Sequence, residues 1–507
     1  MAIIEINNQG LKLAQIRAPL AGAVQVAIGP KALAAITASH EAVAKLIRGD
    51  QAIYGVNTGF GKLATARIAL ADLGQLQINL VRSHAAGTGE LLDSATVRLI
   101  MLLKLASLAK GHSGIDPKTA RALVALINGD VIPVIPAQGS VAASGDLAPL
   151  AHLALVLIGE GEALVAGKRM AGAEALKKIG LQPLALGAKE GLALLNGTQV
   201  STAAALHALV DAERTMQAAI VAGAMSVDAI KGSDTPFDSR IQAVRPHPGQ
   251  AKLAHLYREL LKGSAIRASH LTGDDKVQDP YSFRCQPQVM GAALDVLRTA
   301  AGTLLIEANS VSDNPLVFAE DGEVLSGGNF HAEPVGFAAD MMALAIAEIG
   351  SISERRIAEL TDTTISELPP FLVQEPGLNS GYMIAHVTAA ALASENKMLS
   401  HPASVDSLPT SANQEDHVSM AMHGALRLHR MNSNTEGIIA IELLAAAEGL
   451  DFRRPLKSSV SLEEAHAIVR TKIARRLTDR EFSRDIDAAR MIIRSGEVAS
   501  LVGPLLE

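Results

Sequence analysis

Three long helical patterns constrain the fold of this chain most. They cover Thr198 to Ile230, Ala332 to about Leu360, and Ala412 to Leu450, the last with a weak point at Asn432–Asn434. A helix of thirty residues is roughly 45 Å long, and segments such as Ala218–Met225 are apolar on more than one face. Such helices must be buried on all sides, inside a bundle or between subunits. We therefore predict an oligomer.

The composition predicts an all-α fold with small β decorations. Hydrophobic residues make up 49% of the chain, aromatic residues 3%, and tryptophan is absent. Such a core is typical of closely packed helices. Short strands are expected at Ala23–Ile28, at residues 163–170, and in a hairpin of 316–318 with 323–325. The segment 110–116 predicts a division into an N-terminal domain, 1–112, and a helical-bundle domain, 113–507.

Charge and cysteine content exclude several classes of protein. The net charge is −7 without a long basic stripe, which argues against nucleic acid or an anionic membrane as a partner. A single Cys285 permits neither an internal disulfide nor a thiolate metal cluster, and it fits a reducing cytoplasm. No metal-ligand spacing occurs among the 15 histidines. Neither a secretory leader nor a membrane span is predicted.

The tripeptide Ala143-Ser144-Gly145 carries unusual backbone chemistry. If the Gly145 nitrogen attacks the Ala143 carbonyl carbon and two waters leave, one taking the Ser144 hydroxyl, the backbone becomes a methylidene-imidazolone. That ring is an electrophile, whereas side chains supply nucleophiles, acids and bases. Glycine is needed at the third position because a side chain would block the compressed backbone approach. An ordinary loop is the alternative, since Ser-Gly-Asp before a proline is common turn chemistry.

The glycine-rich segment Tyr54–Lys62 does not match a phosphate-binding loop. That loop requires Gly, four residues and then Gly-Lys-Ser/Thr, whereas Val56 and Leu63 stand in this chain. Three glycines in seven residues instead predict a mobile loop with Tyr54 as its proton-transferring group. Packing alone would also explain a loop tyrosine.

Two further polar segments are candidates for a site. Gln278–Arg284 offers an amide, a phenol and a guanidinium, a set suited to binding an amino-acid carboxylate. The alternative is a surface arginine paired with a neighbouring acid. Asn413–His417 is polar inside an otherwise apolar helical stretch between Ala412 and Ala421, where burial would be costly unless these residues are paired or functional.

Seven ordered segments carry a resemblance to a known family. The chain resembles the aromatic amino-acid ammonia-lyases, which form the methylidene-imidazolone (MIO) group autocatalytically, and among them the histidine-specific members. The likeness extends from Tyr54 to about Leu450. The segments are Tyr54–Gly61, Ser83–Gly87, Gly139–Leu150, Leu195–Thr198, Val277–Met290, Ser326–Pro334 and Asn413–Met420.

The resemblance implies a long-helix bundle similar to the fumarase and aspartase superfamily. It also implies a D2 homotetramer in which three subunits build each active site. The implied cofactor is the MIO group, a 5-imidazolinone cross-link between Ala143 and Gly145 with 2,3-didehydroalanine at Ser144, and no external cofactor. The implied partner is L-histidine, without nucleic acid or membrane, in the cytoplasm.

The resemblance also assigns roles around the ring. Asp146 would hold the loop for cyclisation, and Tyr54 matches the base that removes the β-proton. Asn196 and Arg284 would hold the substrate carboxylate. The residues expected to line and position the ring are Gln278, Tyr281 and Phe330. A departure from the family is Ala142, where glycine is usual, and the added methyl is expected to slow ring closure.

His84 and Glu415 match positions that distinguish histidine-type members, and they would contact the imidazole or the amine. Glu415 suits an imidazole better than a phenyl ring, which would leave a buried carboxylate unpaired. The implied reaction is non-oxidative elimination of ammonia from L-histidine to give trans-urocanate, the first step of histidine degradation.

Two alternatives stay open at this point. One is another MIO enzyme, a tyrosine or phenylalanine lyase or an aminomutase, against which His84 and Glu415 argue. The other is a non-catalytic oligomeric scaffold, against which the presence of Tyr54, Ser144 and Arg284 argues. Beyond Leu450 we expect the arginines to form a solvated face; they are Arg453, Arg454, Arg475 and Arg476.

Overall fold

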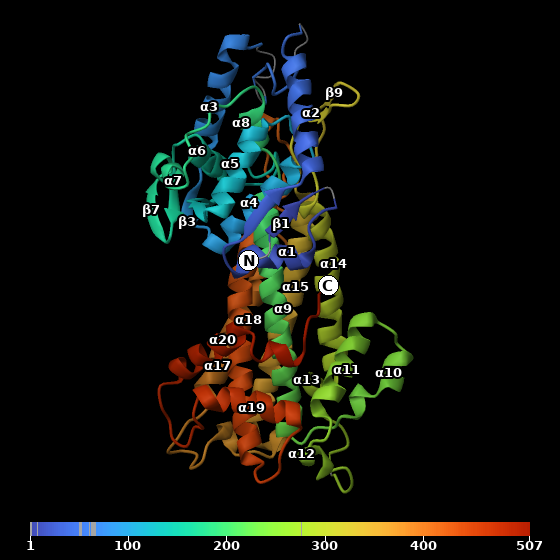
Figure 1. Ribbon diagram of the computed structural model, residues 1–507. Helices are drawn as coiled ribbons and strands as arrows, with labels where there is room; N and C mark the ends of the chain where they lie inside the picture. The colour runs from blue at the N-terminus through green and yellow to red at the C-terminus, as the bar shows by residue number, and fades with distance from the viewer. Residues whose placement is uncertain are drawn as a thin grey trace. The chain divides into compact units, whose positions relative to one another are not determined.

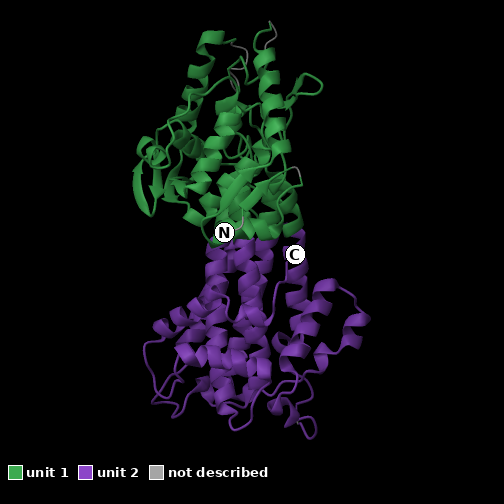
Figure 2. Cartoon of the chain, in the orientation of Figure 1, with its two compact units in different colours: residues 1–207, 301–340, 402–426 green, residues 208–300, 341–401, 427–507 purple. Residues whose placement is uncertain are grey.

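A computed structural model describes residues 3–7, 9–49, 53–59, 61, 67–274 and 276–506 of the 507-residue chain. The chain forms two compact units (Figure 2). Unit 1 comprises residues 1–207, 301–340 and 402–426, and unit 2 comprises residues 208–300, 341–401 and 427–507. A domain boundary near residue 112 stays a prediction.

Helices dominate both units (Figure 1). The helices are α1 (Leu13–Ala21), α2 (Pro30–Leu46), α3 (Leu73–His84), α4 (Ser94–Leu108), α5 (Pro117–Asn128), α6 (Leu147–Leu157), α7 (Gly172–Lys178), α8 (Glu190–Leu195), α9 (Gln199–Ala229), α10 (Ser239–Ala243), α11 (Pro248–Leu261), α12 (Ala265–Ala268), α13 (Tyr281–Arg284), α14 (Gln286–Ala308), α15 (Glu333–Thr361), α16 (Thr363–Ser366), α17 (Met383–Leu399), α18 (Ala421–Phe452), α19 (Val460–Lys472) and α20 (Phe482–Ser495). The prediction of a mainly helical fold is confirmed.

The strands of the described residues all belong to unit 1, in four small sheets. They are β1 (Ile3–Ile6), β2 (Gln25–Ile28), β3 (Thr88–Leu91), β4 (Val131–Pro133), β5 (Pro136–Gln138), β6 (Glu162–Val165), β7 (Lys168–Ala171), β8 (Leu316–Phe318) and β9 (Glu323–Leu325). β1 and β2 pair in parallel; β3–β5, β4–β6–β7 and β8–β9 are antiparallel. The predicted strands β2, β6, β7, β8 and β9 are confirmed, whereas the four remaining short strands were not predicted.

Helix α4 forms the core of unit 1. Asp93 caps it, because its Oδ1 accepts a hydrogen bond of 2.9 Å from the backbone N–H of Thr96. From Thr96 to Leu108 each of its residues except Arg98 is buried. A helix buried on nearly every side matches its almost continuous apolar sequence. Lys104 is the one lysine within this buried stretch.

The long helices α9 and α15 lie where the sequence predicts them. The prediction of helix for residues 412–420 is wrong, because α18 begins only at Ala421. Ser411, Ala412, Asn413 and Met420 adopt left-handed backbone angles, φ between 50° and 62°, which an α-helix cannot contain. The polar segment 413–417 is therefore a loop.

The predicted weak point of α18 does not break the helix. Asn432 Nδ2 donates to Ala208 O at 2.8 Å, and Asn434 Nδ2 donates to Asn396 Oδ1 at 3.0 Å. Both amide N–H groups thus donate to neighbouring helices of unit 2, which gives these donors a partner inside the bundle.

The prediction of a solvated arginine face beyond Leu450 is wrong. Arg476 is only 4% exposed and pairs with Asp485 at 2.8 Å, while Arg453 Nε donates to Ala229 O at 2.8 Å. Arg475 contacts the buried Glu448 at 3.2 Å. These arginines stabilise the C-terminal part of unit 2, because each donates hydrogen bonds to a carbonyl or a carboxylate there.

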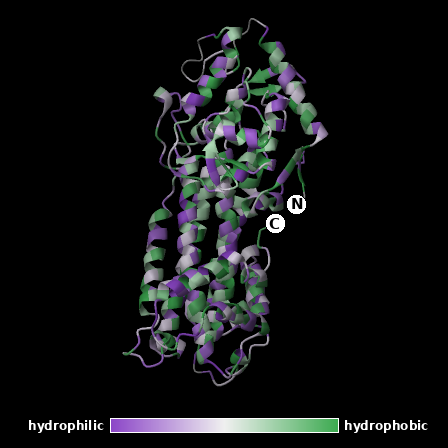
Figure 3. Ribbon diagram, turned by 60° about the vertical axis from the view of Figure 1, so that its left-hand side comes forward, coloured by the Kyte–Doolittle hydropathy of each residue, from purple (hydrophilic) through white to green (hydrophobic). Residues whose placement is uncertain are grey.

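Helices α14 and α15 are long and apolar enough to cross a membrane by length and composition alone. Core helices of soluble proteins pass the same test. The most apolar part of α15 is 61% buried within the protein. Figure 3 shows hydrophilic residues interspersed along the helices of both units. The corresponding part of α14 is 39% buried, so burial within the chain supports a core position for α15 more than for α14.

Candidate active site

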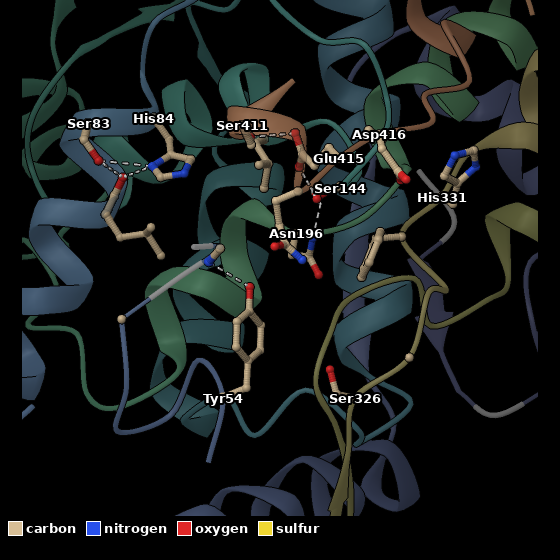
Figure 4. Close-up of a pocket in the computed structure, with 18 of the residues that line it drawn as sticks. Tyr54, Ser83, His84, Ser144, Asn196, Ser326, His331, Ser411, Glu415 and Asp416 are labelled. Atoms are coloured by element: carbon tan, nitrogen blue, oxygen red, sulfur yellow. Dashed lines mark hydrogen bonds between the residues drawn. The ribbon is translucent and has the colours of Figure 1, made fainter. Parts of the chain in front are cut away.

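A cavity of about 890 Å³ opens in unit 1, and its walls come from segments far apart in the sequence (Figure 4). Helix α3, the loop before α6, the residue after α8, and the segments 326–331 and 411–417 contribute to it. Seven of the residues to which the resemblance assigned roles line this cavity: Tyr54, His84, Ala143, Ser144, Asn196, Phe330 and Glu415. The fold therefore brings most of the predicted site together.

Tyr54 stands at one wall of the cavity (Figure 4). Its hydroxyl accepts a hydrogen bond of 3.3 Å from the backbone N–H of Gly61. Phe60 and Lys62, which belong to the predicted glycine-rich loop, lie outside the described residues. The described part of the loop thus presents one hydroxyl group to the cavity.

The backbone at Gly145 is pressed against a second chain segment. Gly145 has a left-handed φ of 72°, and a Cβ added there would lie 2.4 Å from Gly197 O. The next residue, Asp146, donates its backbone N–H to the same Gly197 oxygen at 2.8 Å. No side chain fits at this approach, so the third residue of the tripeptide must be glycine.

Asp146 ties the tripeptide to the start of α9. Its fully buried Oδ2 accepts hydrogen bonds from the backbone N–H groups of Val200 (3.0 Å) and Ser201 (2.7 Å), and its Oδ1 accepts from Ser140 Oγ (2.8 Å). Burial raises the pKa of Asp146, and these hydrogen bonds oppose that rise. A carboxylate at a helix N-terminus is stabilised by the helix dipole. The loop is therefore anchored to a long, rigid helix.

Ala142 adopts φ of 52°, a left-handed conformation that costs roughly 1 kcal/mol or more for a residue with a Cβ. Its carbonyl accepts hydrogen bonds from Ser419 Oγ (2.9 Å) and from the N–H of Ala332 (3.2 Å). Its own N–H donates to Ser140 Oγ at 3.0 Å. The segments before α15 and α18 thus hold the residue that departs from the family pattern.

Asn196 contacts the tripeptide directly. Its Nδ2 donates to the Ser144 carbonyl oxygen at 2.6 Å, and the residue is only 3% exposed. Asn196 follows the short helix α8, whose residues are buried throughout. This helix fixes the amide beside the tripeptide carbonyl.

His84 ends helix α3 and is half-buried. Its Nδ1 lies 2.9 Å from Leu80 O, and a carbonyl can only accept, so Nδ1 carries the hydrogen. Burial lowers the pKa of His84 below its ordinary value, which favours the neutral ring. The other nitrogen, Nε2, is therefore a hydrogen-bond acceptor.

Glu415 faces Ser144 across the cavity wall (Figure 4). Ser144 Oγ donates to its Oε1, while Thr410 Oγ1 (2.6 Å) and Ser411 Oγ (2.8 Å) donate to its Oε2. Burial raises the pKa of Glu415, but these three hydrogen bonds outweigh burial and lower it overall. The group is thus a carboxylate that touches the hydroxyl expected to leave.

Three of the predicted site residues, Gln278, Tyr281 and Arg284, belong to unit 2. Gln278 and Arg284 line a second cavity of about 360 Å³. Tyr281 is 71% exposed, and the guanidinium carbon of Arg284 lies 4.6 Å from the centre of its ring. The cavity in unit 1 and the cavity in unit 2 share no lining residue.

Across the described ranges, no group of three or more His, Cys, Asp or Glu side chains is arranged to hold a metal ion.

Comparison with known proteins gives the family. The sequence profile of the aromatic amino acid lyases matches residues 11–471. The chain belongs to this family. This lyase is 58% identical over 494 residues to the histidine ammonia-lyase of Rhodospirillum rubrum, covering 97% of this chain and 96% of that relative.

Two solved structures have the same fold as this lyase. The histidine ammonia-lyase from Trypanosoma cruzi has a TM-score of 0.92 at 41% identity, over 100% of this chain and 96% of its own. The tyrosine aminomutase from Streptomyces globisporus has a TM-score of 0.94 at 34% identity, over 99% and 98%. The long-helix fold is therefore shared by proteins of different activities, an ammonia-lyase and an aminomutase.

Three polar residues near the tripeptide of this lyase were not predicted: Ser140, Ser419 and Lys104. The two serines accept or donate hydrogen bonds at Ala142 and Asp146. Lys104 Nζ donates to the Asn196 main-chain oxygen at 2.7 Å. Serines in loops give no distinctive signal, but a lysine inside the apolar run 99–108 is a detectable one.

Proposed function

We propose that this lyase is a histidine ammonia-lyase (EC 4.3.1.3), which eliminates ammonia from L-histidine without oxidation and releases trans-urocanate. The observation that carries the proposal is the pair of His84 and Glu415, which line one cavity together with Ser144. The 58% identity to a histidine ammonia-lyase over nearly the whole chain supports it.

We further propose that Ala143, Ser144 and Gly145 cyclise to the MIO group. The backbone around Gly145 has room for no Cβ, and Asp146 anchors the loop on both sides. Both features suit a ring closure between residues 143 and 145. Once formed, the MIO group supplies an electrophile, which no unmodified side chain provides.

His84 and Glu415 would bind the imidazole and the amine of the substrate. His84 Nε2 can accept the imidazole N–H, because Nδ1 is committed to Leu80 O. Glu415 Oε1 loses its partner when the Ser144 hydroxyl leaves as water, so it becomes free to accept an N–H of the substrate. A phenyl ring would satisfy neither acceptor, which makes L-phenylalanine a poor substrate.

Proton removal and carboxylate binding would use the remaining residues. Tyr54 is the base proposed to take the β-proton, since its hydroxyl stands at the cavity wall. Phe330 lines the same cavity and would position the ring. Asn196 and Arg284 would hold the substrate carboxylate, Arg284 by a bidentate contact. Gln278 and Tyr281 accompany Arg284 in unit 2 and would complete the site from another subunit.

A D2 homotetramer with shared active sites is the assembly that we propose. Large apolar side chains on α15 and α17 are exposed in the single chain, among them Phe337 (55%), Leu344 (60%), Ile384 (64%) and Val387 (55%). Apolar surface of this kind marks protein–protein interfaces. Residence in the cytoplasm agrees with the single Cys285.

The test is a direct comparison of substrates. The purified protein is incubated with L-histidine, L-tyrosine or L-phenylalanine, and the ultraviolet absorbance of the unsaturated acids is followed. We expect L-histidine to be preferred by at least about a thousandfold, because two half-buried acceptors stay unpaired with the other substrates. Faster turnover of L-tyrosine or L-phenylalanine, or a β-amino acid product, would replace the proposal by one of the other MIO activities.

A further inference from the structure

Lys104 is a buried cation to which the proposed reaction gives no role. It lies on α4, is 1% exposed, and donates to the main-chain oxygen of Asn196 at 2.7 Å. Within the part of the chain that the structure describes, Lys104 has no ion-pair partner. Lys189 is also buried, but it pairs with Asp313 at 3.1 Å. Lys104 therefore differs from the neighbouring lysine in carrying a charge that no carboxylate directly compensates.

One residue separates this cation from the reactive tripeptide. Asn196, whose carbonyl accepts from Lys104, donates its Nδ2 to Ser144 O at 2.6 Å. The following carbonyl, Gly197 O, accepts the backbone N–H of Asp146 at 2.8 Å. Lys104 therefore binds the carbonyl that lies between Asn196 Nδ2 and Gly197 O, the two groups that contact the tripeptide loop.

The charge is not needed for packing. Helix α4 is buried among apolar side chains, and a neutral side chain of similar length would fill the same space. Burying an ammonium without a paired carboxylate costs free energy. Burial lowers the pKa of Lys104 to about 8. The negative charges of Asp313 and Asp146 raise this pKa, and the positive charge of Lys189 lowers it further. At neutral pH the group is thus mainly charged in spite of its burial.

We propose that Lys104 is a positioning residue that keeps Asn196 on the Ser144 carbonyl and directs positive charge toward that oxygen. This inference rests on the proposed function, because the Ser144 carbonyl accepts electrons only once the ring has formed. When a nucleophile adds to the methylidene carbon, a new bond forms there, and the double-bond electrons move toward Ser144 O. A proton from water completes the addition. Fixed positive charge near such an oxygen favours the step.

The experiment compares three substitutions that separate position from charge. Lys104→Met removes both the donor and the charge, Lys104→Gln keeps a donor without the charge, and Lys104→Arg keeps both. The matched control is Lys118→Met, since Lys118 is an exposed lysine on α5 of the same unit. Intact-protein mass first shows whether each variant has lost two waters. Sodium cyanide is then added, and the gain of one HCN per chain is timed by mass.

We expect cyanide addition to be about 10- to 100-fold slower in Lys104→Met and Lys104→Gln, because a hydrogen bond to a charged group is lost. Lys104→Arg should stay within a few-fold of the wild type and Lys118→Met should match it. With L-histidine, kcat should fall by a comparable factor while KM changes less. A structural role alone would not change the cyanide rate of a folded, dehydrated variant.

Two outcomes overturn the inference. The first is a dehydrated Lys104→Met or Lys104→Gln protein that adds cyanide within about twofold of the wild type. If Lys104→Met does not fold, the second outcome is decisive: the Gln and Arg variants add cyanide at equal rates. If the wild type itself shows no loss of two waters, the proposed function fails instead, before any variant is compared.

Discussion

Two regions of the molecule carry the residues to which the resemblance assigned roles, and they differ in how their polar groups are satisfied. In unit 1, Ser144, Asn196 and Glu415 are joined by hydrogen bonds, and His84 is fixed by Leu80 O. In unit 2, the segment Gln278–Arg284 is more open. Tyr281 is 71% exposed, and the buried Nε of Arg284 has no hydrogen-bond partner among the described residues.

The difference indicates which part of the proposed site is preorganised within a single chain. Most polar groups of the unit 1 site are held by their own neighbours, and among them only the buried Asn196 Oδ1 has no hydrogen-bond partner within the described residues. A guanidinium nitrogen that is buried but unpaired costs free energy unless a ligand or another subunit satisfies it. This difference supports the proposal that another subunit completes the site at the unit 2 segment.

The largest effect should come from removing one residue of each region. Tyr54→Phe removes the proposed base and Arg284→Ala the carboxylate clamp, so each should lower kcat/KM for L-histidine by at least about a thousandfold. If the two residues come from different subunits, mixed tetramers of the two variants contain some intact sites. Activity measured after mixing should therefore recover in part.

The contrast between the two regions is contradicted if mixing the two variants restores no activity. Mixed tetramers verified by native mass spectrometry that stay inactive would place Tyr54 and Arg284 of the same subunit in one site. A mixture of each variant with itself, carried through the same procedure, is the control.

A smaller effect is expected inside the unit 1 group. Glu415→Gln keeps the shape but removes the charge, and it should lower kcat/KM for L-histidine by about 10- to 100-fold, as expected for a lost charged hydrogen bond. The same variant should still lose two waters, which intact mass would show. Failure to dehydrate would mean that Glu415 acts in ring formation rather than in substrate binding.

The pH dependence of stability should report the buried charge of unit 1. The pKa of Lys104 in the folded protein is about 8, below its ordinary value of 10.5, so folding disfavours the charged form. The cost is fully present below pH 8 and is lost as pH rises toward 10.5. The wild type should therefore gain about 3 kcal/mol relative to Lys104→Met over this range. Denaturant unfolding at several pH values measures it, and parallel curves would contradict the assigned burial.

The smallest effect concerns the residue that departs from the family pattern. Ala142→Gly removes the conformational cost of a left-handed alanine, which is about 1 kcal/mol. This substitution should speed the loss of two waters a few-fold. Ser419→Ala removes a hydrogen bond to Ala142 O and should slow it by a similar factor. Ser404→Ala is a matched control, since Ser404 is buried in unit 1 but bonds Asp340. Time-resolved mass of newly synthesised protein follows all three.

The sequence predicted the parts of the fold that depend on local pattern. Helices α9 and α15 follow from their periodicity, and the hairpin of β8 and β9 from two short strand patterns that flank a turn. The loop at residues 411–420 could not be predicted in this way. Its left-handed residues include alanine, serine and methionine, which rarely adopt this backbone conformation by local preference. A bond within the loop, from Ser411 Oγ to Glu415 Oε2, and one to a distant segment, from the N–H of Met420 to Val141 O, hold this conformation.

The site followed from the sequence only where a motif named its residues. Ser144, Asn196 and Glu415 were found through the family likeness, and the structure places them at one cavity. The buried arginines beyond Leu450 were mistaken for a surface because charge alone does not reveal a partner such as Asp485. Lys104 was missed because its role depends on a contact with a residue ninety-two positions away.

The central claim is that the backbone of residues 143–145 becomes the electrophile. It is tested most directly by digesting active protein and measuring the mass of the peptide that spans this tripeptide. The account predicts a peptide lighter by two waters, and a Ser144→Ala protein that folds but lacks both this change and most of the activity. A peptide of unmodified mass in fully active protein would contradict the account.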